Sequence, residues 1–162
     1  MRRPRLGGMA TTRTRSGRVI YLLTAIAVVF SLGHHLDHVI RGNHVGWPLT
    51  DQVTVFTISL GIYPILLAAV LLYRAGRIGA GVWALLSGNG ALFVAGVHFG
   101  PLAVESPRDI LDPYPTLLGW FWFGWLIVFV GVLVVTCVVE TRLWLRQRAG
   151  RARSVSTGAT GR

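Results

Sequence analysis

Four long apolar segments, separated by short polar stretches, dominate the hydrophobicity pattern of this chain. They run over residues 19–40, 53–73, 78–99 and 117–139. Each is close to the roughly 20 residues that an α-helix needs to cross the hydrocarbon core of a bilayer. Helices are expected because lipid offers no hydrogen-bond partners to backbone amides and carbonyls. The pattern therefore predicts an all-α, polytopic membrane protein, a four-helix transmembrane bundle of up-down topology.

The basic residues are concentrated on one side of this expected bundle. All sixteen are arginines: six precede Val19, six follow Glu140, and Arg74 and Arg77 lie between the second and third segments. In a four-span chain these three regions share one face of the membrane, and arginine-rich loops stay on the cytoplasmic side. We therefore expect an inner-membrane protein with both termini in the cytoplasm. The net charge of +10 is explained in this way, and nucleic-acid binding is not expected.

The two ends of the chain differ in composition from its apolar centre. Residues 1–18 and 141–162 are basic and polar, and we expect both to be disordered tails beside a single transmembrane domain, residues 19–140. The first apolar segment also has the basic start of a signal peptide, but His34 and His35 stand where a small-residue cleavage site would lie. An uncleaved helix is therefore expected. Whether translation starts at Met1 or Met9 stays open.

The second and third segments carry signs of how the helices pack. Gly61 and Pro64 lie near the middle of the second segment and predict a kink there. The third segment is rich in glycine, alanine and serine, which allow helices to approach closely in lipid, so we expect it to be the central packing helix. Asn89 within it is expected either to form an interhelical hydrogen bond, which we favour, or to be a polar site in a cavity. So much small-residue surface also allows a homo-oligomer or a partner in a membrane complex.

Histidines gather near the outer end of the first apolar segment. His34 and His38 lie four residues apart, so their side chains share one face of a helix, and Asp37 lies on the same side. His98 ends the third segment at a matching depth. Ionisable residues inside a membrane segment usually face the bundle interior and have a partner. The sequence therefore predicts a site formed by His34, Asp37, His38 and His98.

Three interpretations of this histidine cluster stay open. A histidine pair at i, i+4 is a known metal-binding geometry, and imidazole with carboxylate suits zinc, iron or copper; two histidines on different helices could equally ligate a haem. Asp37 would then be a fourth ligand or would orient an imidazole. The cluster could instead be a metal-free acid–base or proton-handling site, or serve structure alone. His35 points to another face and His44 lies in a loop, so neither joins the predicted ligands.

The acidic residues outside this cluster are expected to lie in water. Glu105 belongs to the longest loop, residues 100–116, for which we favour a solvated acidic loop over a lid or an oxygen ligand. Ser106 and the proline after it predict the start of a short helix in that loop. Glu140 follows the last apolar segment and is expected to pair with Arg142 or Arg146.

The cluster resembles part of a signature in a family of small prokaryotic four-span membrane proteins. The residues that carry the resemblance are 34–42, 47–48, 98–101 and 105–107, so it covers most of the four-span core. The resemblance implies a membrane bundle with a first helix rich in histidine and aspartate, and it brings no established activity. The sequence has no P-loop, no serine-hydrolase elbow and no H-E-x-x-H motif.

Three classes of function remain, and whether the chain is an enzyme stays open. The first is a metal- or haem-binding membrane protein in redox chemistry, electron transfer or metal handling. The second is a metal-free membrane enzyme that acts on a lipid or an isoprenoid with a histidine as the acid–base group. This second class requires a lipid-sized cavity between the helices. The third is an accessory subunit of a membrane complex, whose histidines only stabilise its outer end.

Overall fold

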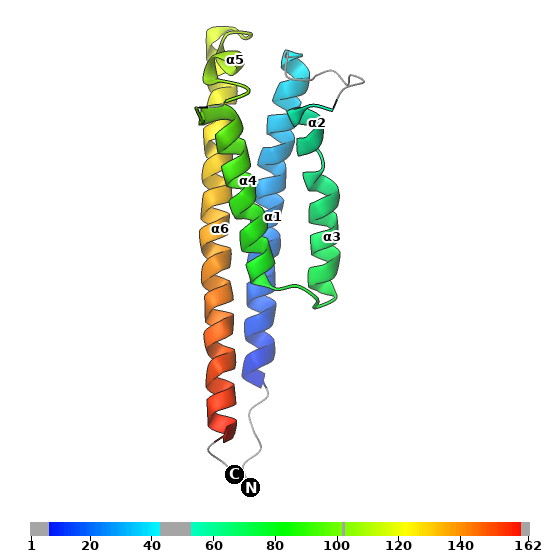
Figure 1. The fold of residues 1–162 in the computed structure, drawn as a ribbon, viewed down its shortest axis with the longest axis vertical. Helices are drawn as coiled ribbons and strands as arrows, with labels where there is room; N and C mark the ends of the chain where they lie inside the picture. The colour runs from blue at the N-terminus through cyan, green and yellow to red at the C-terminus, as the bar shows by residue number, and fades with distance from the viewer. Residues whose placement is uncertain (1–6, 43–52, 102, 160–162) are drawn as a thin grey trace.

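The computed structural model describes residues 7–42, 53–101 and 103–159, and this part of the chain contains helices and no strand. The helices are α1 (Gly7–Arg41), α2 (Val55–Ser59), α3 (Ile62–Arg74), α4 (Ala80–Phe99), α5 (Pro107–Leu111) and α6 (Thr116–Ala159) (Figure 1). Four segments are long and apolar enough to cross a membrane: Ser16–Arg41, Val55–Arg74, Ala80–Phe99 and Thr116–Ala152. They correspond to the four segments predicted from the sequence. The first turn of α1 and the last turn of α6 lie at the same end of the molecule (Figure 1).

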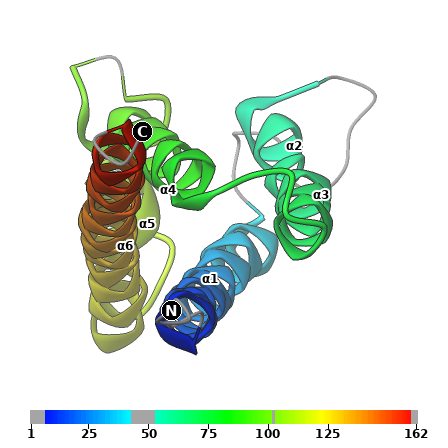
Figure 2. The same ribbon diagram turned by 90° about the horizontal axis from the view of Figure 1, so that it is seen from below.

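The helix around which the others pack is α6. It contacts α4 most extensively, α1 on another side and α5 near its start. Figure 2 shows α4 and α6 side by side, with α2 and α3 on the side of the bundle away from α6. The prediction that the small-residue helix, α4, is the central one is therefore wrong. The reason is that α6 is the longest helix, so it can pack against α4, α1 and α5 along its length.

Glycines nevertheless bring α4 close to α6, as the small-residue pattern predicts. A side-chain carbon at Gly81 would lie 2.9 Å from the Trp144 ring, and one at Gly88 would lie 3.1 Å from the sulfur of Cys137. Neither position has room for a larger residue without a shift of its neighbour. The small residues therefore allow the close helix contact that van der Waals packing needs in lipid.

The second membrane segment is two helices, and this confirms the predicted kink. α2 ends at Ser59 and α3 begins at Ile62. Because Pro64 has no N–H, it cannot donate to the carbonyl of Leu60, and the Tyr63 N–H donates to that carbonyl instead, at 3.2 Å. Residues at the break, Ser59, Gly61 and Ile62, line the cavity inside the bundle.

The first and last long helices, α1 and α6, extend into the segments for which we expect disorder. α1 begins at Gly7 and α6 ends at Ala159. No proline interrupts residues 7–18 or 141–159, and each residue added to an existing helix gains one backbone hydrogen bond. The described helices thus reach into both tails, and the expected disorder of the tails and the limits of the transmembrane domain, residues 19–140, stay predictions. His44 lies outside the described residues.

Large apolar side chains cover the outside of the bundle. Leu92 is 75% exposed and Leu22 is 62% exposed, and many other apolar residues on all four long helices are similarly open. A water-soluble protein rarely exposes apolar surface on this scale. The exposed face is therefore the surface expected to meet lipid chains.

A close contact between α1 and α6 lies at Gly33, and we expect Gly33→Ala to destabilise the protein. The added methyl carbon would lie 2.5 Å from the Trp125 ring, which is held in place because its indole N–H donates to the Phe30 carbonyl at 2.9 Å. Overpacking of this kind costs about 1–3 kcal/mol of the free energy of unfolding. Unfolding in a mixed-micelle titration with sodium dodecyl sulfate measures the difference.

The matched control is Gly131→Ala in α6, where an added methyl meets open space. Alanine has the higher helix propensity, so this variant is expected to be neutral or more stable by up to about 1 kcal/mol. Equal stability of the two variants would contradict the close packing at Gly33.

Candidate metal centre

Three buried histidines from two helices converge at one end of the bundle. His34 and His38 lie one turn apart in the last part of α1, and His98 lies in the last turn of α4. One ring nitrogen from each lies within 4.8 Å of the other two, and the Nε2 atoms of His34 and His38 are 3.3 Å apart. The structure thus brings together three of the four residues predicted from the sequence. This group could hold a metal ion.

Two helix ends fix the positions of these rings. α1 stops after Arg41 because Gly42 adopts a φ of 55°, a conformation that glycine reaches without strain, and its N–H donates to the His38 carbonyl at 3.1 Å. α4 stops at Gly100, which is extended and precedes a proline. The chain then folds back on α4, and the Glu105 N–H donates to the Val97 carbonyl at 3.2 Å. This return places Glu105 next to His98.

The ring of His98 is oriented by the backbone of Glu105. Its Nδ1 lies 3.1 Å from the Glu105 carbonyl oxygen, and because a carbonyl can only accept, Nδ1 is the donor. In a neutral ring the proton is then on Nδ1, and Nε2 keeps a lone pair that can bind a metal ion. Such a hydrogen bond from the second nitrogen is the usual way in which proteins orient a histidine ligand.

Glu105 itself is fully buried, so the favoured interpretation of a solvated acidic loop is wrong for this residue. Its side chain is 0% exposed, its Oε2 lies 3.3 Å from Nε2 of His38 and 3.5 Å from Nδ1 of His98, and its Oε1 accepts a hydrogen bond from Arg41. Buried carboxylates need a charged or hydrogen-bonded partner, and Arg41 supplies one that the loop sequence does not reveal. The short helix that follows, α5, is capped by Ser106 as predicted.

Asp37 lies next to the histidines, but it faces other partners. Its Oδ2 accepts a hydrogen bond from Nε of Arg41 at 3.0 Å and lies 2.9 Å from Nη2 in an ion pair, and its Oδ1 accepts from the hydroxyl of Tyr114 at 2.8 Å. It is not part of the group of ligand atoms that lie together. In this arrangement its contact with the site runs through Arg41 and Glu105. Whether it ligates a metal stays a prediction.

A compact charge network therefore lies over the three rings. Arg41, whose side chain is fully buried, joins Asp37 and Glu105 and also donates to the Asp109 carbonyl at 2.8 Å. Burial raises the pKa of the Glu105 carboxyl, and Arg41 opposes this shift. Burial also raises the pKa of the Tyr114 hydroxyl, and the hydrogen bond to Asp37 acts in the same direction. With both carboxyl groups ionised, the network carries one net negative charge, which a bound cation would balance.

His35 faces away from this group, as its position on the helix predicts. Its Nδ1 donates to the Ser31 carbonyl at 2.8 Å and lies 2.9 Å from the Tyr63 hydroxyl, and its Nε2 lies 2.9 Å from the Ser59 hydroxyl. These bonds connect α1 to α2 and α3. His35 therefore stabilises the contact with the broken second segment.

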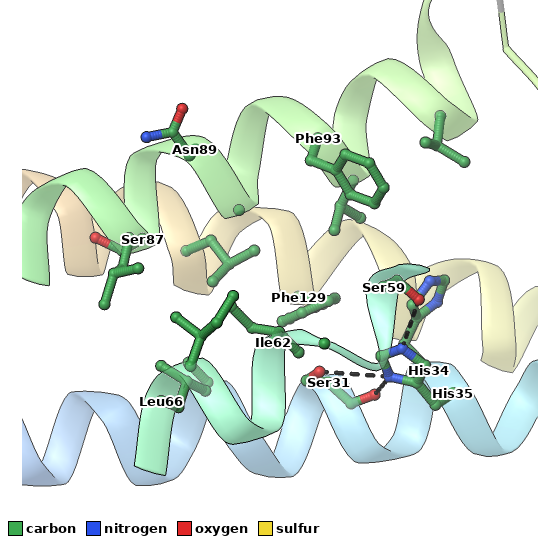
Figure 3. Close-up of a pocket in the computed structure, with 18 of the residues that line it drawn as sticks. Ser31, His34, His35, Ser59, Ile62, Leu66, Ser87, Asn89, Phe93 and Phe129 are labelled. Carbon is green, nitrogen blue, oxygen red and sulfur yellow. Dashed lines mark hydrogen bonds between the residues drawn. The ribbon is translucent and has the colours of Figure 1, made fainter. Parts of the chain in front are cut away.

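Beneath the histidines lies a cavity of about 380 Å³ that all four membrane segments line. Its walls are mostly apolar, with Phe93 and Phe129 in its middle, and Figure 3 shows Ser87 and Asn89 toward one end and His34 and His35 at the other. A volume of this size is in the range of pockets that bind small molecules. The space between the helices that the second class of function requires is thus present at the size of a small molecule.

Two polar residues of this cavity differ from their predicted roles. Glu140 is 1% exposed and accepts a hydrogen bond from Ser87 at 2.8 Å, whereas the sequence predicts a pair with a neighbouring arginine. The difference arises because the apolar pattern of α6 continues past residue 139, so Glu140 is inside the span. Asn89 is exposed, and its amide donates to the Leu85 carbonyl of its own helix, so the predicted interhelical bond is not formed.

No family model, no curated protein and no solved structure matches this sequence.

Proposed function

We propose that this chain is a multi-pass inner-membrane protein of up-down topology, with both termini cytoplasmic, that binds a transition-metal ion at His34, His38 and His98. The observation that carries the proposal is the convergence of three buried imidazoles, each able to offer one nitrogen, within 4.8 Å. The arginine-rich segments support the orientation, because they fall at the end opposite the histidines. The metal site then lies on the outer side.

The spacing of the rings favours a single ion over a haem. Two nitrogens bound to one tetrahedral ion at roughly 2.0–2.1 Å are about 3.3 Å apart, which matches the 3.3 Å between His34 and His38. A haem held by two histidines needs a clear plane between the rings. Here the His34 ring contacts both others, with centroids 4.7 Å from His38 and 5.0 Å from His98.

The ligand set favours zinc, iron or copper and leaves room for a further ligand. Neutral imidazoles suit these three metals. Glu105 Oε2, 3.3 Å from His38, is the nearest carboxylate oxygen to complete the set, and Asp37 would act through Arg41. Catalytic metal sites commonly have three protein ligands and one open position. An open position beside an apolar cavity favours redox chemistry or metal-assisted chemistry on a bound molecule over metal storage.

A metal-free enzyme acting on a lipid or isoprenoid is the second candidate, and the cavity beneath the histidines favours it. His34 and His38 line this cavity and could exchange a proton with a bound substrate. The two candidates differ in one respect that can be measured directly, the presence of a metal.

Elemental analysis with a visible absorption spectrum tests the proposal, on detergent-purified wild type, His38→Ala and His35→Ala. The wild type and His35→Ala are expected to hold close to one zinc, iron or copper ion per chain, and His38→Ala to have lost most of it. His35 is the matched control because it neighbours His34 and bonds elsewhere. Equal metal in all three, or none in the wild type after reconstitution with each ion, would refute the metal site. A haem absorption band would refute the single ion.

A further inference from the structure

The cavity contains a second polar cluster, at the end away from the histidines. Within the part of the chain that the structure describes, four buried polar atoms there lack a hydrogen-bond partner: Thr24 Oγ1, Trp83 Nε1, Thr136 Oγ1 and Glu140 Oε1. All four side chains line the same cavity. A buried polar atom left unsatisfied destabilises the fold, and native proteins contain few of them. Four around one cavity indicate a place where a polar group binds.

These atoms belong to three helices that meet at one level. Trp83 and Ser87 lie one turn apart on α4, and Thr136 and Glu140 lie one turn apart on α6. The two pairs are joined because the Ser87 hydroxyl donates to Glu140 Oε2 at 2.8 Å. Thr24 lies one turn from Ile20 on α1, and Ile20 packs against Trp83. Trp83, Thr136 and Glu140 are each at most 3% exposed. We call Thr24, Trp83, Ser87, Thr136 and Glu140 the inner cluster.

The distance from the inner cluster to the histidines follows from two helices independently. Ser87 precedes His98 by eleven residues on α4, and Thr24 precedes His34 by ten residues on α1. At 1.5 Å per residue both give about 15–17 Å along the bundle. The wall between the two ends is apolar, and Phe129 from α6 packs against the His34 ring. A ligand that spans the cavity is therefore long, narrow and mostly hydrocarbon.

We propose that the inner cluster binds the hydroxyl end of a neutral long-chain alcohol, whose chain fills the cavity toward the histidines. The free oxygen of Glu140 accepts and the indole N–H of Trp83 donates, and one hydroxyl group can serve both. A carboxylate or phosphate end would place an anion beside the buried Glu140 carboxyl with no cation to pair with it, and a plain hydrocarbon would leave every buried polar atom unsatisfied. An extended chain advances about 1.2 Å per bond, so about twelve carbons reach the histidines. This proposal stands independently of a metal there.

The test uses a photoreactive probe, 1-dodecanol with a diazirine at its far carbon, and the full chain in nanodiscs of phosphatidylethanolamine and phosphatidylglycerol. Two matched probes carry the same diazirine, one a dodecane without the hydroxyl and one a dodecanoic acid. The alcohol is expected to label the protein saturably, with competition by unlabelled 1-dodecanol. The two matched probes are expected to label about tenfold less, because a hydrogen bond to buried groups that otherwise lack a partner is worth about a factor of ten in affinity. Peptide mapping should place the adducts at the histidine end of the cavity, near His34 and Phe129.

Two variants test the hydroxyl contact, and one serves as the control. Glu140→Leu and Trp83→Phe are each expected to lower labelling by the alcohol about tenfold. Trp83→Phe removes only the indole N–H and keeps an aromatic ring, so it tests the contact even where Glu140→Leu disturbs the fold. Val138→Leu, an exposed position on α6, is expected to label as the wild type does. Equal labelling by alcohol and dodecane would overturn the proposal, because the hydroxyl would then make no contact. Labelling that does not saturate would also overturn it, because the cavity would then hold only water. Adducts that map to the inner cluster would contradict the proposed direction of the chain. Unchanged labelling of Trp83→Phe and Glu140→Leu would also overturn the proposal.

Discussion

Arg41→Leu is expected to lower the free energy of unfolding by about 3–5 kcal/mol, the usual cost of removing one partner from a buried ion pair. The Arg41 side chain is 0% exposed and joins the carboxylates of Asp37 and Glu105. Without it, both carboxylates remain buried with no cation, and the end of α1 loses its bond to the Asp109 carbonyl. The same titration in mixed micelles measures this loss.

The control for this variant is Arg108→Leu, which removes an exposed arginine from α5 at the same end of the molecule. Exposed substitutions usually change stability by less than about 0.5 kcal/mol. A further variant, Arg41→Leu with Asp37→Asn and Glu105→Gln, should recover part of the lost stability, because no ionised carboxylate is then left without a partner. A loss from Arg41→Leu no larger than that from Arg108→Leu would show that the charge network does not hold this end together.

His98→Ala is expected to weaken metal binding by more than about 100-fold. Loss of a hydrogen-bonding residue behind a ligand already costs 10–100-fold in affinity, and His98 is proposed as a ligand itself. Competition with a chelator of known affinity measures the change, on protein loaded with the ion found in the wild type.

Glu105→Gln gives a graded comparison for that variant. It keeps the backbone carbonyl that orients His98 but removes the carboxylate charge beside His38. An intermediate loss of about 10–100-fold is expected. If His98→Ala binds the ion as tightly as Glu105→Gln does, His98 is not a ligand.

The parts of the fold and the site that depend on local sequence could be predicted. Helix-length apolar runs identify membrane segments because lipid imposes that length, and Pro64 breaks its helix wherever the helix lies. The i, i+4 spacing of His34 and His38 places both rings on one face of any helix. The position of His98 beside these rings could be predicted only by also comparing depths in the bilayer, because His98 ends the third segment on the side where His34 and His38 end the first.

The parts that could not be predicted depend on how the chain folds back on itself. Glu105 reaches the histidines only because the chain reverses after Gly100 and bonds to α4, and nothing in the loop composition separates it from solvated acids. Asp37 can reach either the histidines or Arg41 from one helix face, and spacing alone does not choose between them. For Glu140 the sequence does contain a signal of burial, because leucine and tryptophan continue the apolar pattern of α6 beyond it.

X-ray absorption at the edge of the bound metal, on the purified wild type, tests the metal centre most directly. Nitrogen or oxygen neighbours are expected at about 2.0–2.1 Å, as for a zinc ion bound by imidazole and carboxylate, together with the multiple-scattering pattern of three imidazole rings. Together with the loss of metal from His38→Ala and His98→Ala, that result would support His34, His38 and His98 as the ligands. A spectrum with fewer than two imidazoles, with sulfur, or with the pattern of a porphyrin would contradict the proposed site.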